Sequence, residues 1–143
     1  MKKLILALLG LVFVACTQAE PKTAVKQGEN MNIQIGTQQF QAELVDNPTV
    51  AELRKLLPLT LTMTDLHRNE KYASLPQTLP RNDQAVERIE VGDVLLFQGD
   101  TLVVFYESFS TPYRYTRIGK ITQSEQLKNA LGAGSATVSF TLK

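Results

Sequence analysis

The chain has 143 residues, with 15 basic and 14 acidic side chains, one histidine, one cysteine and no tryptophan. Positive and negative charges are nearly balanced and are not gathered in blocks, which argues against a nucleic-acid-binding protein. A lone cysteine cannot form an intrachain disulfide, and a lone histidine offers no metal-ligand spacing, so we expect no metal and no cofactor.

The first fifteen residues have the layout of a secretory signal peptide. Lys2 and Lys3 give a positive start, residues 4–14 are apolar, and Ala15 is small. The apolar stretch is too short to cross a bilayer of about 30 Å as a helix. We therefore expect residues 1–15 to be a cleaved signal and the protein to be exported.

Cys16 stands directly after this segment. Phe13-Val14-Ala15-Cys16 resembles the lipobox of bacterial lipoproteins, although such boxes most often carry Leu where this chain has Phe13. The alternative is an ordinary signal beside a stray thiol, which would invite mixed disulfides after export. We expect a lipidated Cys16, carrying acyl chains such as palmitate, to hold the protein in the bacterial cell envelope. The residue after Cys16 is Thr17 and not Asp. By resemblance to the sorting rule of diderm lipoproteins, we expect the protein to be held at the outer membrane and to face the periplasm.

The remainder divides into a tether and one domain. Residues 16–30 are polar, include Pro21 and Gly28, and lack an apolar period, which predicts a flexible tether. Residues 31–143 are numerous enough to bury one core without disulfides.

The domain begins with strand-like alternation. Residues 33–35 and 40–44 alternate apolar and polar side chains around a Gly-Thr turn, which predicts a hairpin. A capping box formed by Thr49 and Glu52 then predicts a short helix that stops at Pro58.

The next segments alternate less regularly. Residues 59–64 place threonines between leucines and a methionine, which predicts a strand. Residues 65–70 predict a polar turn, residues 72–80 an extended irregular segment, and residues 81–87 a polar loop.

Continuous apolar runs follow. Residues 94–97 and 102–106 flank a Gln-Gly-Asp turn and predict a buried hairpin. Residues 113–121 predict the strand after it.

The last segment completes the pattern. Thr122 and Glu125 form a second possible capping box before a short helix that ends at Gly132, and alternation over residues 137–142 predicts the final strand. About eight strands with short connections and two short helices favour a mainly β fold, a closed or nearly closed barrel, because closure hides strand edges.

Two stretches resemble a known family. LPLTLTMTDLHRNEKYASLPQTLP (residues 57–80) and GDVLLFQGDTLVVFYESFSTPYRYTRIGKI (residues 92–121) look like the small bacterial cyclophilin-like proteins. The likeness extends over nearly all of residues 31–143. It implies an eight-stranded cyclophilin-like β-barrel, closed or nearly so, with a helix near each end.

The order of elements also resembles that of the true cyclophilins, which are peptidyl-prolyl isomerases. The chain departs from them where their chemistry lies, because it has no Phe-His-Arg run, its only histidine, His67, stands in Leu-His-Arg-Asn, and it has no tryptophan. The resemblance therefore implies the fold and not the activity.

The segment FYESFSTPYRYTRIG, residues 105–119, holds half of the aromatic residues of the chain. Tyr113, Tyr115 and Arg117 alternate, so a strand would place them on one face, where they could hold a proline or another flat ligand. The alternative is that these rings only pack the barrel and its rim. The candidate ligand-groove residues are Tyr106, Phe109, Tyr113, Tyr115 and Arg117.

Other candidates for chemistry are weaker. Asp65 and Glu70 bracket a polar turn, and we expect them to be solvated rather than to act as an acid–base pair. We therefore expect a non-catalytic module, anchored to the membrane through Cys16, that binds a peptide or a small molecule. A peptidyl-prolyl isomerase with a divergent active site remains the alternative.

Overall fold

The computed structural model describes Gly10 and residues 29–143, so the predicted signal peptide apart from Gly10, Cys16 and nearly all of the predicted tether lie outside the described residues. The elements, in chain order, are β1 (Asn30–Ile35), β2 (Gln38–Leu44), α1 (Pro48–Leu56), β3 (Leu59–Leu66), β4 (Glu70–Ser74), β5 (Gln84–Ala85), β6 (Arg88–Ile89), β7 (Asp93–Phe97), β8 (Thr101–Phe105), β9 (Phe109–Ser110), β10 (Arg114–Thr122), α2 (Leu127–Leu131) and β11 (Ala136–Leu142).

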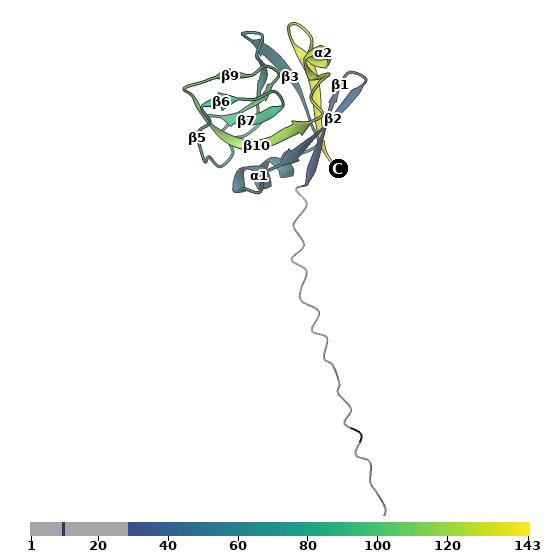
Figure 1. The fold of residues 1–143 in the computed structure, drawn as a ribbon, viewed down its shortest axis with the longest axis vertical. Helices are drawn as coiled ribbons and strands as arrows, with labels where there is room; N and C mark the ends of the chain where they lie inside the picture. The colour runs from purple at the N-terminus through teal and green to yellow at the C-terminus, as the bar shows by residue number, and fades with distance from the viewer. Residues whose placement is uncertain (1–9, 11–28) are drawn as a thin grey trace, which may run out of the picture.

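Eight antiparallel strands close into a barrel (Figure 1). Neighbouring strands follow the order β2-β1-β11-β3-β4-β8-β7-β10, and β10 pairs back onto β2, with Gly119 opposite Leu44. The short β5 adds a ninth strand to β10. The predicted closed, mainly β barrel with two short helices is confirmed.

The closing pair of strands approaches closely at one glycine. A Cβ atom on Gly119 would lie 2.4 Å from the carbonyl oxygen of Glu43 on β2, a separation that real Cβ atoms do not adopt. The backbone of β10 also bulges here, since its register against β7 shifts between Arg117 and Gly119. Gly119 therefore allows β10 to bend and to pair with both of its neighbours.

The two helices contribute to the interior at different ends of the molecule, α1 at the bottom and α2 at the top of Figure 1. Both predicted capping boxes are wrong. Asn47 caps α1 by accepting a hydrogen bond from the Val50 N–H at 2.8 Å, while the Thr49 hydroxyl donates to the Pro80 carbonyl instead. Before α2, Gln126 makes no side-chain capping bond, but the helix does end at Gly132 as predicted.

The strand β4 was missed by the sequence prediction of a turn and an irregular segment. Its inward-facing position is held by Lys71, which is fully buried, so the usual apolar alternation is broken. The Lys71 Nζ donates to Asp65 Oδ2 at 2.9 Å and to the carbonyl oxygens of Gly132 and Gly134. The ion pair joins β3 to β4, and the two hydrogen bonds hold both strands to the turn that follows α2.

Two strands of the barrel, β7 and β8, are buried on both faces. In β8, Leu102 and Val104 enter the barrel core, whereas Val103 and Phe105 belong to a second apolar cluster outside it. We call this second cluster the outer cluster. Its buried residues are Ile89, Leu95, Val103, Phe105 and Tyr115.

A two-stranded sheet of β6 and β9 contributes to the outer cluster through Ile89 and Phe109. Burial on two faces explains the continuous apolar runs in β7 and β8, which belong to the predicted hairpin. The predicted polar loop over residues 81–87 was wrong in part, because β5 lies within it. In the described part of the chain, neither helix has the length and apolar character needed to cross a membrane.

Barrel closure can be tested at Gly119. Gly119→Ala should lower the free energy of unfolding by about 1–3 kcal/mol, because β2 and β10 must separate to admit the methyl group. Thr137→Ala, at an exposed position of β11, is the control and should change it by about 0.5 kcal/mol or less. Urea unfolding measures both, and equal losses would contradict a tight β2–β10 contact.

Candidate functional site

A hollow of about 380 Å³ lies on the outside of the barrel, beside the outer cluster. This volume falls within the range typical of small-molecule sites. We call it the outer pocket. Its lining residues are Leu66, Glu70, Tyr72, Phe97, Gln98, Thr101, Val103, Tyr113 and Tyr115.

Strand alternation brings these side chains to one surface. In β4, Lys71 enters the barrel, so its neighbours Glu70 and Tyr72 face outward. β8 lies beside β4 and places Val103 opposite Tyr72. Tyr115 comes from β10, on the far side of β7. Most of the pocket lining is thus carried by paired strands, and only Gln98 and Tyr113 lie outside them.

Aromatic rings pack against one another around the pocket. Phe97 lies 6.0 Å from Tyr113 and 5.6 Å from Tyr115, measured between ring centroids. Tyr115 also packs edge-on against Phe105 at 5.7 Å. Tyr115 is buried with 4% exposure, whereas Tyr113 is 60% exposed. Tyr115 is therefore part of the wall, and Tyr113 is a ring that a ligand could cover.

Glu70 is the one carboxylate that lines the pocket. Burial, with a smaller effect from the charge of Asp65, raises its pKa from 4.5 to about 7. Burial also raises the pKa of Tyr115, and the nearby Glu70 charge adds to this. Within residues 29–143, no cationic side chain forms an ion pair with Glu70. A carboxyl group with such a shift in a hollow is a candidate binding group.

The charged cluster on the opposite face of β4 is satisfied internally. Asp65 accepts hydrogen bonds from the Tyr106 hydroxyl and from Lys71, and these lower its pKa to about 2. Burial, with the bond to Asp65, raises the pKa of Tyr106. The Lys71 Nζ also lies 5.5 Å from the Tyr106 ring. This cluster stabilises the barrel and leaves no open position for a ligand.

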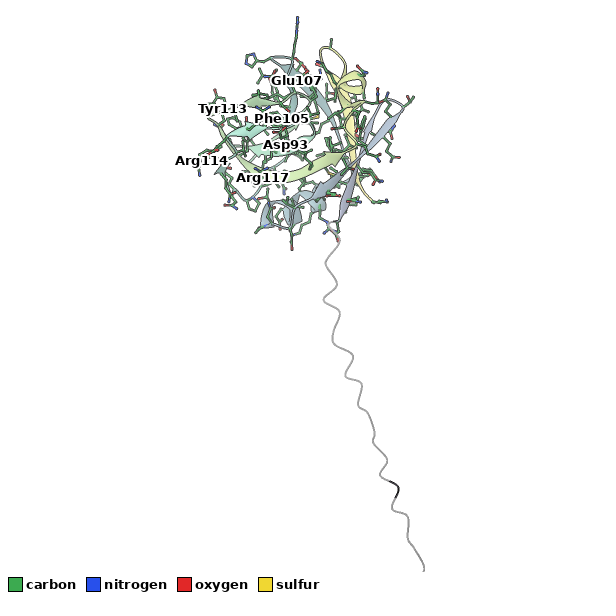
Figure 2. All side chains as sticks on the ribbon, in the orientation of Figure 1. Asp93, Phe105, Glu107, Tyr113, Arg114 and Arg117 are labelled. Carbon is green, nitrogen blue, oxygen red and sulfur yellow. The ribbon has the colours of Figure 1, made fainter. Side chains whose placement is uncertain are left out.

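The predicted groove residues separate into three places. Tyr113 and Tyr115 line the outer pocket. Phe109 packs against Phe105 in the outer cluster without lining the pocket, and Tyr106 faces the barrel interior. Arg117 is exposed on β10 toward α1, where its carbonyl oxygen accepts a hydrogen bond from Asn47 (Figure 2).

The expectation that Tyr113, Tyr115 and Arg117 share one strand face holds only for the last two. Arg117 pairs with Leu95 of the outer cluster and so shares the outward face of β10 with Tyr115, but it does not line the pocket, and Tyr113 precedes β10, which begins at Arg114. Figure 2 shows Tyr113 and Arg114 at one edge of the molecule and Arg117 nearer to its middle.

Sequence reasoning found two of the nine lining residues, Tyr113 and Tyr115. Among the seven that it missed, Glu70, Tyr72 and Phe97 carry the charge and the other aromatic rings of the site. Glu70 was expected to be solvated in a turn, but it is the first residue of β4 and is partly buried. The alternation of Glu70, Lys71 and Tyr72 could have placed Glu70 in the site. It does so only if Lys71 is known to point inward, because Glu70 and Tyr72 then both face outward.

A second hollow, of about 620 Å³, lies between β2 and the segment after β10. Its lining is mainly glutamine, including Gln39, Gln41 and Gln123, and these side chains lie largely at the surface. It lacks the cluster of aromatic rings around a carboxylate that distinguishes the outer pocket. Among the residues that the structure describes, no group of three His, Cys, Asp or Glu side chains could hold a metal ion.

The fold and the hollow together define a small closed β-barrel with a ligand-sized site on its outer surface. A family model described as the cyclophilin-like family matches residues 33–143, and the chain belongs to that family. The resemblance seen in the sequence is thereby confirmed.

Among solved structures, the chain is similar to a hypothetical protein from Archaeoglobus fulgidus whose solution structure is known. The two are 20% identical, with a TM-score of 0.61, over 82% of this chain and 96% of the other. At this identity the likeness shows the fold alone. No curated protein matches the chain.

The Glu70 pKa predicts a pH-dependent stability. Between pH 4.5 and about pH 7 the folded chain keeps the Glu70 proton and the unfolded chain loses it, so rising pH favours unfolding. Glu70→Gln removes this effect. Its free energy of unfolding should exceed that of the wild type by about 1–2 kcal/mol at pH 8, allowing for screening by solvent, and match it at pH 4.

Urea unfolding at both pH values measures this difference. Glu52→Gln, on the exposed side of α1, is the control and should show no such change with pH. An equal gain from Glu70→Gln at pH 4 and at pH 8 would contradict the placement of this carboxyl group.

Proposed function

We propose that the chain is an exported, lipid-anchored cyclophilin-like domain that binds a small molecule or a peptide in the outer pocket, without catalysis. The observation that carries this proposal is the outer pocket itself. Phe97, Tyr72 and Tyr115 form a fixed aromatic surface, and Tyr113 stands beside it with 60% of its surface exposed. Rigid rings with one free face bind flat or apolar groups at little entropic cost.

Catalysis of prolyl isomerisation is the second candidate, and it asks more of the site. The amide barrier of about 18–20 kcal/mol falls when a donor bonds to the prolyl nitrogen. Within the described residues, no arginine lines the outer pocket, and Arg117 lies elsewhere on β10. The tyrosine hydroxyls of the pocket could serve as this donor instead, because a phenol can donate a hydrogen bond.

The proposal for the membrane rests on the sequence. The apolar residues 4–14, small Ala15 and sole Cys16 support lipidation, which would place three acyl chains in a membrane. Thr17 supports the outer membrane of the bacterial envelope, with the barrel facing the periplasm. The membrane, through Cys16, and the pocket ligand are the partners that we propose.

Tyrosine fluorescence gives a direct test of the pocket. The chain has no tryptophan, and three of its four tyrosines line the outer pocket. Short proline peptides and small aromatic compounds, titrated into the purified full chain, should change this fluorescence. Tyr113→Ala should weaken binding by about tenfold or more while shifting the urea midpoint little, because the ring is exposed.

The same proline peptides serve to separate the two candidates. We expect cis-to-trans isomerisation of the peptides to remain as slow in the presence of the chain as it is spontaneously, with a time constant of tens of seconds. Acceleration that Tyr113→Ala abolishes would replace the binding module by an isomerase. Binding that Tyr113→Ala and Tyr72→Ala leave intact would place the ligand outside the outer pocket.

Anchoring is tested at the lipidation residue. In a bacterial host, Cys16→Ser should leave the protein unlipidated and move it from the membrane fraction to the soluble fraction. Thr17→Ser is the control and should remain with the membrane. Unchanged fractionation of Cys16→Ser would contradict the proposed anchor.

A further inference from the structure

Glu70 gives the outer pocket a chemical preference. It is the only carboxylate among the lining residues, and none of them is a lysine, an arginine or a histidine. Four of the lining residues, Tyr72, Phe97, Tyr113 and Tyr115, are aromatic. The pocket therefore combines one acidic group with several electron-rich rings.

Few ligands satisfy both features. An anion would be repelled by Glu70, and a neutral apolar group would cover the carboxylate without giving it a partner. A small metal ion prefers several oxygen ligands, and the pocket offers one carboxylate. A cation with apolar substituents pairs with the carboxylate and is also attracted to the aromatic rings.

We propose that the outer pocket takes a small organic cation of the alkylammonium class, with its charge against Glu70 and its alkyl groups against Tyr113 and the neighbouring rings. This inference rests on the proposed function of the same pocket and names the chemistry of its ligand. Quaternary and tertiary amines are the members of this class with the most apolar surface around the charge.

The charged surroundings of Glu70 predict how binding depends on pH. Asp65 on β3 is the charged group that acts on Glu70, because its negative charge favours the protonated form of the Glu70 carboxyl. The Tyr72, Tyr113 and Tyr115 phenols line the same pocket, and burial raises the pKa of Tyr115. A cation whose own charge does not titrate should therefore bind about tenfold more tightly at pH 8 than at pH 6, as Glu70 ionises.

The experiment compares choline with its neutral carbon isostere, 3,3-dimethylbutanol, by titration of tyrosine fluorescence in the purified full chain. The two probes have the same shape and differ in charge. At pH 8, choline should bind at least about tenfold more tightly than 3,3-dimethylbutanol. Glu70→Gln should remove this difference and the pH dependence, while Glu52→Gln on α1 should keep both.

The outcomes separate this inference from the proposed function. Equal binding of the two probes, or a preference for choline that Glu70→Gln retains, would overturn the cation site. If Tyr113→Ala then weakens both probes, the pocket still binds ligands. Binding of neither probe would also overturn the cation site, whereas the titration with proline peptides and aromatic compounds decides the proposed function separately. Unfolding curves of Glu70→Gln establish that the variant is folded.

Discussion

Pairing between β10 and β2 is the constraint on which the rest of the structure depends. It requires Gly119, because the Glu43 carbonyl oxygen occupies the space that a Cβ would need. Once the barrel is closed, every strand has a defined inside and outside. The inside is filled by one apolar core that includes side chains of both helices. The outside of β4, β7, β8 and β10 is thereby free to carry a second cluster, and the outer pocket is a gap in that cluster.

The strand β4 shows how one alternation serves two purposes. Lys71 points inward, where Asp65 and two carbonyl oxygens accept its hydrogen bonds, and so the turn after α2 is held against the barrel. Glu70, its neighbour, consequently points outward into the aromatic surface, where its pKa rises through burial. A shift of one residue in register would exchange the two side chains, leaving a lysine in the pocket and a carboxylate in the barrel. The structural ion pair thus fixes the position of the candidate binding group.

Much of the fold could be predicted from the sequence, and the reasons are local. Alternation predicted the first hairpin and the last strand, and the apolar runs of β7 and β8 predicted a buried hairpin. β4 was not predicted because a lysine, Lys71, occupies its inward-facing position. Two of the oxygen atoms that accept hydrogen bonds from Lys71 belong to residues about sixty positions away in the chain. The first capping box failed for a similar reason, since the Thr49 hydroxyl donates a hydrogen bond to the more distant Pro80 carbonyl.

Only a small part of the site could be predicted. Tyr113 and Tyr115 are close in the sequence and were found, but Glu70, Tyr72 and Phe97 reach the pocket through strand pairing that no local pattern shows.

The most direct test of the outer pocket is a measurement of the pKa of Glu70. NMR of the Glu70 side-chain carboxyl carbon, recorded as a function of pH in the ¹³C-labelled chain, gives this value. We expect a titration midpoint near pH 7 that falls when choline is added. A midpoint near the ordinary value of 4.5, unmoved by choline, would mean that Glu70 faces water and that the outer pocket is not the site described.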